Sequence, residues 1–218
     1  MPTISRRKIE EENRGMLERQ TRFRVAADVV TAALASFPEV EEIALIGSVA
    51  RPLWPEVPRF SPFRQHRVEI WHECKDVDLA VWLNQLDRLR ELNRARNLSV
   101  QPIREMIGYG VANHEVEIFV LEPGSNRYLG RLCRFNQCPK GKRACEVPGC
   151  GREAFLQQHE DFVFWNNALD EDRIMRLYRR PEGIIRRAAD TPASGQEPPA
   201  TFHARGSGAS FLHRRTSP

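Results

Sequence analysis

Two acidic residues in one apolar segment are the first candidates for chemistry in this sequence. Asp76 and Asp78 alternate with apolar residues over 76–81, a pattern that predicts a β-strand. Alternate side chains of a strand share a face, so both carboxylates are expected on one face, roughly 7 Å apart along the chain. Two such acids repel each other unless a cation lies between them, and carboxylate oxygens suit Mg²⁺ or Mn²⁺. The alternative is a pair of solvated acids on an exposed face.

A third carboxylate, that of Glu117, lies in a second apolar segment, 116–120, which also predicts a strand. A lone charge there is costly to bury unless it is paired or bound to a metal. Three carboxylates from two strands could hold two divalent ions and clamp the attacking and leaving oxygens of a phosphoryl displacement. Glu117 could also accept the proton of the attacking hydroxyl. Glu115 shares the predicted strand face and competes for the role of third acid.

A Gly-Ser pair supplies a complementary feature for binding phosphate. The continuous apolar run 43–46 predicts a buried strand that ends at Gly47 and Ser48, and residues 49–51 are expected to begin a short helix. Glycine lets a phosphate approach the backbone closely, and backbone N–H groups at a helix start bind anions. Ser48 can donate its hydroxyl to a phosphate oxygen, and Arg51 would place a cation one turn later. An ordinary turn is the alternative.

The combination of these segments resembles the nucleotidyltransferase superfamily, whose fold is shared by DNA polymerase beta and the small bacterial nucleotidyltransferase domains. The segments that carry the resemblance are 43–51, 76–81 and 116–119. The resemblance implies that the Gly-Ser pair holds a nucleoside triphosphate, that the two strand aspartates bind divalent metal, and that a third acid completes the site. Carried over onto this sequence, the implied site residues are Gly47, Ser48, Asp76, Asp78 and Glu117.

The sequence departs from the family pattern between the Gly-Ser pair and the first aspartate. The family usually has a short spacer there, whereas this chain carries an insertion over residues 52–73. Four prolines in the insertion interrupt any long regular element. Its aromatic residues, Trp54, Phe60 and Phe63, favour a segment that packs against the core, so we expect an ordered insertion.

Four clustered cysteines indicate a second kind of site, in the C-terminal half. They are Cys133, Cys138, Cys145 and Cys150. In a reducing compartment, thiolates at such close spacing favour tetrahedral Zn²⁺. Four thiolates leave no open position, so the zinc would be structural and would contribute folding energy to a segment poor in apolar residues. The alternatives are two disulfides, unliganded core cysteines, or His159 in place of one thiolate.

The composition is that of a globular protein. The chain has 218 residues, of which 41% are hydrophobic and 28% charged, and a formal net charge of +4. A mildly basic balance permits a nucleotide or nucleic-acid partner without requiring one. The sequence has no apolar run of transmembrane length, and its first thirty residues lack the apolar core of a signal peptide, so we expect a cytoplasmic protein without a membrane partner.

Periodicity and turn residues outline the remaining elements. Besides the three strands, we expect helices over 14–36 and from an Asn84 cap to about residue 97, and a basic hairpin over 173–187. The predicted fold is α+β, with helices flanking one side of a small mixed sheet. The predicted organisation is a core over 1–130, a zinc-binding extension over 131–188, and a disordered tail over 189–218.

The expected function is metal-dependent transfer of a nucleotidyl group from an NTP to an acceptor hydroxyl. The acceptor is a protein side chain, an RNA end or a small molecule, and the sequence does not distinguish among them. The alternative function is that of a catalytically degenerate nucleotidyltransferase fold that binds nucleic acid or protein through its zinc and basic segments.

Overall fold

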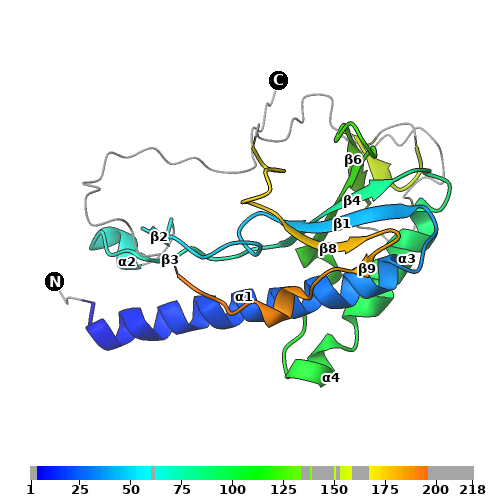
Figure 1. Ribbon diagram of the computed structural model, residues 1–218. Helices are drawn as coiled ribbons and strands as arrows, with labels where there is room; N and C mark the ends of the chain where they lie inside the picture. The colour runs from blue at the N-terminus through cyan, green and yellow to red at the C-terminus, as the bar shows by residue number, and fades with distance from the viewer. Residues whose placement is uncertain are drawn as a thin grey trace.

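A mixed β-sheet lies at the centre of the protein. The computed structural model describes residues 4–59, 62–133, 138, 150, 153–158 and 167–195. Within these residues the sheet has seven strands in the order β7-β6-β5-β4-β1-β8-β9 (Figure 1). β4 and β5 are parallel, and the other neighbouring strands are antiparallel. The strands are β1 (Val40–Ile46), β4 (Val77–Leu83), β5 (Val116–Leu121), β6 (Tyr128–Leu132), β7 (Leu156–Gln157), β8 (Met175–Arg179) and β9 (Gly183–Ile184). The predicted α+β class with a mixed sheet is confirmed.

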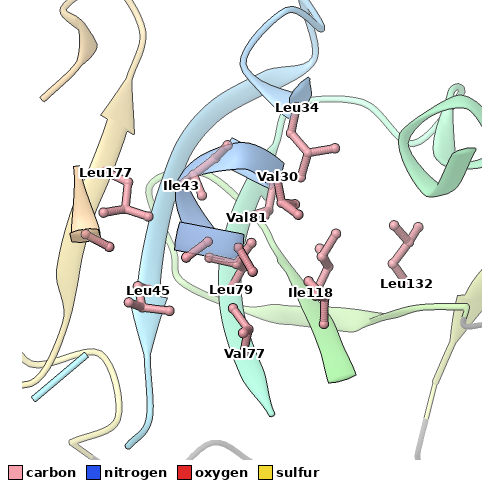
Figure 2. Packing of buried hydrophobic residues seen from close by; sticks show 14 of the residues in the cluster. Val30, Leu34, Ile43, Leu45, Val77, Leu79, Val81, Ile118, Leu132 and Leu177 are labelled. Carbon is pink, nitrogen blue, oxygen red and sulfur yellow. The ribbon is translucent and has the colours of Figure 1, made fainter. Parts of the chain in front are cut away.

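Two helices, α1 (Arg6–Leu34) and α3 (Leu89–Val100), pack against each other on one face of this sheet. Figure 2 shows Val30 and Leu34 of α1 among the apolar side chains of the strands, beside Ile43 of β1 and Val81 of β4. Period-two alternation sends every second residue of a strand to the helix side, and in β4 these residues are Val77, Leu79 and Val81.

Both helices differ from their predicted bounds. α1 begins at Arg6 rather than near residue 14, because the Ser5 side chain accepts a hydrogen bond from the backbone N–H of Lys8 and caps the helix there. Asn84 does not cap α3, which begins at Leu89. The Asn84 amide donates instead to a carboxylate oxygen of Glu41. α4 (Ile103–Ile107) and the 3₁₀ helix η1 (Asn113–Glu115) then lead from α3 to β5.

The opposite face of the sheet carries a smaller apolar cluster. Its buried members are Ala44, Ile46, Ala80, Trp82, Phe119 and Leu121. Asp78 and Glu117 stand two residues before Ala80 and Phe119, so strand alternation places both acids on this second face. The helices therefore cover one face, and the acidic residues lie on the other.

The described parts of the insertion, residues 52–59 and 62–73, are ordered, as predicted, and Phe60 lies outside the described residues. It contains the two-residue strands β2 (Pro55–Glu56) and β3 (Ile70–Trp71), which pair with each other, and the short helix α2 (Pro62–Gln65). The backbone N–H of Trp71 donates to Asn13 Oδ1 at 2.7 Å, which fixes the insertion to α1. The Trp54 and His72 rings stack with their centroids 4.0 Å apart.

The C-terminal half contributes strands to the same sheet. The boundary predicted after residue 130 falls inside β6, and β6 to β9 extend the sheet on both edges. The predicted hairpin is present as β8 and β9. The prediction of a disordered tail is wrong for residues 189–195, because Arg24 donates hydrogen bonds to the carbonyls of Thr191 and Pro192 and holds this segment against α1. The rest of the predicted tail, 196–218, lies outside the described residues.

Within the described ranges, no helix combines the length and the apolar character that crossing a membrane requires.

Candidate active site at one end of β1, β4 and β5

Gly47, Asp78 and Glu117, three of the predicted site residues, lie together at one end of the central strands. Asp78 of β4 is opposite Ile46 of β1 and also opposite Glu117 of β5. The last residue of β1 is Ile46, so the Gly47-Ser48 turn begins beside Asp78. Asp76 immediately precedes β4. The sheet register thus brings together parts of the motif that are far apart in the sequence.

Gly47 is in close contact with the carboxylate of Asp78. Its φ is +73°, in the left-handed region that favours glycine. A Cβ at this position would lie 2.7 Å from Asp78 Oδ2. Any other residue would be strained and would also collide with the carboxylate, so Gly47 allows the turn and the acid to lie this close together.

The Gly-Ser turn does not begin a helix, which corrects the expectation for residues 49–51. Residues 47–50 form a turn. Arg51 precedes Pro52, and a residue before proline is disfavoured in the α conformation. The backbone anion site expected at a helix start is therefore absent from this described segment.

Two buried polar residues of α1 hold the turn instead. Gln20 Nε2 donates to the carbonyl oxygens of Ser48 and Arg51, at 3.2 and 2.7 Å. Arg24 Nε donates to the Val49 carbonyl oxygen at 3.0 Å. Our sequence reasoning missed both residues. Their signal was position, because they share the helical spacing of the apolar residues Phe23 and Ala27, which face the sheet.

Glu117 is held by an arginine that the sequence analysis also missed. Arg131 Nη1 on β6 lies 2.7 Å from Glu117 Oε2. The Glu117 side chain is only 3% exposed, and that of Arg131 is 19% exposed. Arg131 Nη2 also donates to Gln157 Oε1 of β7, at 3.3 Å. The prediction that a charge at position 117 must be paired or metal-bound is met here by an ion pair.

The competing third acid, Glu115, lies off the strand. It ends η1, and its Oε2 accepts a hydrogen bond of 2.7 Å from the backbone N–H of Ala112. Its Oε1 is 3.4 Å from Arg19 Nη2, and Arg19 also pairs with Glu73. The register places Glu117, not Glu115, beside Asp78.

Ser48 and Arg51 both contact residues that limit their freedom. The side chain of Ser48 hydrogen-bonds Cys74, a buried thiol whose pKa is raised chiefly by burial. The Arg51 guanidinium lies 4.7 Å above the Trp54 ring. Burial, with the positive charge of Arg173, lowers the pKa of Arg51. Arg51 is thus positioned by the insertion rather than by a helix.

The donor chemistry of this end of the sheet fits a hard divalent cation, but the side chains are not gathered as a ready-made metal site. Among the described residues, no three His, Cys, Asp or Glu side chains form a metal-binding group. Carboxylates are nevertheless the ligand type that Mg²⁺ and Mn²⁺ prefer. Asp76 and Asp78 are the residues that would hold the cation, and Arg131 would compete with it for Glu117.

Three of the four predicted zinc ligands can be placed. Cys133, Cys138 and Cys150 line one small cavity. The Cys133 carbonyl oxygen accepts a 3.1 Å hydrogen bond from the buried Arg96, which anchors the start of the cysteine segment to α3. Cys145 and His159 lie outside the described residues, so the zinc site remains a prediction.

Comparisons of this chain with protein-family models, with curated proteins and with solved structures found no match. The resemblance to nucleotidyltransferases therefore rests on the residues and their placement alone.

Proposed function

We propose that this protein is a metal-dependent nucleotidyltransferase that moves a nucleotidyl group from an NTP to an acceptor hydroxyl. One observation carries the proposal: the Gly47 turn lies against the Asp78 carboxylate, and Glu117 is opposite Asp78 on the next strand. A phosphate-binding turn and a metal-binding carboxylate must be neighbours for this reaction, because a cation held by the carboxylate would have to neutralise the charge of the phosphates.

Each residue has a role in this proposal. The Gly47-Ser48 turn accommodates the β- and γ-phosphates, and Arg51, stacked on Trp54, offers them a positive charge. Asp76 and Asp78 bind the divalent cation, which when bound neutralises phosphate charge and orients the triphosphate. The acceptor oxygen forms a bond to the α-phosphorus as the bond to the β-phosphate oxygen breaks, and pyrophosphate leaves. Glu117 assists the cation or accepts the acceptor proton.

A second candidate function is supported by the Arg131–Glu117 pair. An acid already bound to arginine, with no gathered metal group in the described part of the chain, fits a fold that has lost catalysis and serves as a binding module. The positive charge of the β8–β9 hairpin gives the binding-module alternative little support, because its arginines are already bound within the protein. Arg176 and Arg179 are both paired with Glu42, and Arg180 donates to the Val40 carbonyl oxygen.

The test is the fate of the label from NTPs labelled at the α- or γ-phosphate. Each of the four NTPs is incubated with the protein, Mg²⁺ and a cell extract that supplies protein, RNA and small-molecule acceptors. The proposal predicts acceptor labelling from the α-position only, with loss of labelling in Asp78→Asn. Asp87→Asn, an exposed acid beyond the other end of β4, is the matched control and should label normally. Labelling of an acceptor from the γ-position would favour a phosphotransferase. No labelling with any NTP would favour the binding module.

A further inference from the structure

The Arg131–Glu117 ion pair occupies a carboxylate that the proposed reaction assigns to the cation or the base. The pair joins neighbouring strands, since Arg131 of β6 is opposite Phe119, two residues beyond Glu117 on β5. Because Glu117 is also opposite Asp78, the guanidinium lies on the same sheet face as the candidate metal ligands. It is thus placed to compete with a cation for Glu117.

The guanidinium is only partly satisfied in this position. Arg131 Nη1 makes the short contact with Glu117, whereas Nη2 makes a longer bond of 3.3 Å to Gln157. Arg131 Nε is buried and has no hydrogen-bond partner within the described residues. A half-buried arginine with a buried, unused donor is held less firmly than one whose donors are all bonded, so it can be displaced from its carboxylate at a smaller cost.

Electrostatics makes the two partners of Glu117 compete with each other. Adjacent strands lie about 4.8 Å apart, so a divalent cation shared by Asp78 and Glu117 would sit close to the guanidinium. Two positive charges at that range repel each other, and the partial burial of the site makes this repulsion stronger than in bulk water. The cation therefore binds Glu117 more weakly while Arg131 holds it.

We propose that Arg131 is a positioning residue that holds Glu117 in the absence of a divalent cation and thereby sets the cation affinity of the site. This inference rests on the proposed function, because it takes Asp78 and Glu117 as neighbouring ligands. It accounts for two observations together: a buried acid that is already paired, and carboxylates that are neighbours in register without forming a gathered metal group.

The experiment measures Mn²⁺ binding by calorimetry, without nucleotide and without any activity readout. An adjacent opposite charge changes the proton affinity of a carboxylate by about 10- to 1000-fold, so we expect Arg131→Gln to bind Mn²⁺ at least about tenfold more tightly than wild type. Arg131→Met is also neutral and must show the same gain in Mn²⁺ affinity. It replaces the Arg131→Gln variant if that variant does not fold. In the Glu117→Gln background most of the gain should disappear.

A matched control lies in the loop that connects β5 to β6. Arg127 pairs with Glu122 at 2.7 Å, the same distance as in the Arg131 pair, but both side chains are exposed. Arg127→Gln removes the same charge from a pair remote from Asp78 and should leave Mn²⁺ affinity unchanged. Thermal denaturation of each variant establishes that it is folded.

The outcomes separate this inference from the proposed function. Unchanged or weaker Mn²⁺ binding in the folded neutral variants, with binding still dependent on Asp78, would overturn the role of Arg131 and leave the proposed function standing. An equal gain with and without Glu117 would also overturn it, since Arg131 would then act only through general charge. If neither wild type nor any variant binds Mn²⁺, the role of Arg131 and the proposed function are both contradicted.

Discussion

At the scale of single residues, the candidate site depends on how closely Gly47 approaches Asp78. Because Gly47 has no side chain, the turn can lie in contact with the Asp78 carboxylate. The left-handed φ of Gly47 turns the chain at this point. A cation bound to Asp78 would then have the Gly47 turn, the proposed phosphate site, as its immediate neighbour. The contact thus places the proposed phosphate-binding turn next to the proposed metal ligand.

Gly47→Ala tests this contact. A non-glycine residue at positive φ costs about 1–2 kcal/mol, and the new Cβ would also displace Asp78. We expect a loss of stability of that order in chemical denaturation, together with loss of Mg²⁺-dependent NTP binding in calorimetry. Gly183→Ala is the matched control, because Gly183 has φ +82° but no atom within 4 Å of its Cβ position. It should lose similar stability and keep full NTP binding; equal binding loss in both variants would contradict the account.

The insertion contains a residue pair whose contribution depends on pH. The hydrogen bond from His72 lowers the pKa of Glu56 below 4.5, and their contact is 3.0 Å long. A depressed pKa means that the stabilisation is present above the unfolded pKa and is lost as pH falls toward the folded pKa. We therefore expect the stability advantage of wild type over Glu56→Gln to shrink as the pH falls below about 5 in denaturant titrations. A constant difference over that range would contradict the assignment.

At the scale of elements, α1 shapes the turn as well as packing on the sheet. Arg24 is 1% exposed and joins three separate parts of the chain. Its Nε donates to the Val49 carbonyl, and its Nη1 donates to the carbonyls of Thr191 and Pro192. The helix therefore fixes the turn and the last described segment through one guanidinium.

Arg24→Met should release both segments while keeping the apolar part of the side chain. A buried carbonyl left without a donor costs about 1–3 kcal/mol, and Arg24 donates to the buried carbonyl of Val49 and to two part-buried ones, so we expect the unfolding free energy to fall by at least about 2 kcal/mol. Arg14→Met, at an exposed position of the same helix, should change stability by less than about 0.5 kcal/mol. Shortening the chain after residue 190 should destabilise wild type but add little in the Arg24→Met background, because both changes remove the same bonds.

The elements that the sequence predicted well are those whose signal is local. Alternating or continuous apolar runs indicated β1, β4 and β5, and a turn sequence indicated the β8–β9 hairpin. Asp78 and Glu117 were placed correctly because strand alternation fixes their face. Arg131 could not be predicted, since its partner depends on the pairing of β5 with β6. The expected helix after Ser48 was wrong because Pro52 and hydrogen bonds from α1 determine the turn.

At the scale of the whole molecule, the cysteine segment is bounded by strands of the central sheet. β6 precedes it and β7 follows it, and the two strands pair with each other. A metal that holds the segment together would therefore also restrain one edge of the sheet, next to Arg131 and Gln157. We expect zinc to affect the stability of the entire protein rather than that of a separate unit.

Metal analysis of protein produced with zinc tests this expectation. The prediction is about one zinc per chain, and Cys150→Ser should lose it and lower the melting temperature. Cys74→Ser is the matched control, because this buried thiol lies outside the cluster, and it should retain zinc. Wild-type protein without zinc, or zinc retained in both variants, would contradict a four-cysteine site.

The central claim is that Gly47 and Asp78 form a cation-dependent triphosphate site, and NTP binding tests it most directly because no acceptor is needed. ATP, GTP, CTP and UTP are titrated calorimetrically into wild type, Asp78→Asn and Asp87→Asn, with and without Mg²⁺. The account predicts that wild type and Asp87→Asn bind at least one NTP only with Mg²⁺, and that Asp78→Asn does not bind it. The account would be contradicted if NTP binding depended on neither Mg²⁺ nor Asp78, or if wild type bound no NTP.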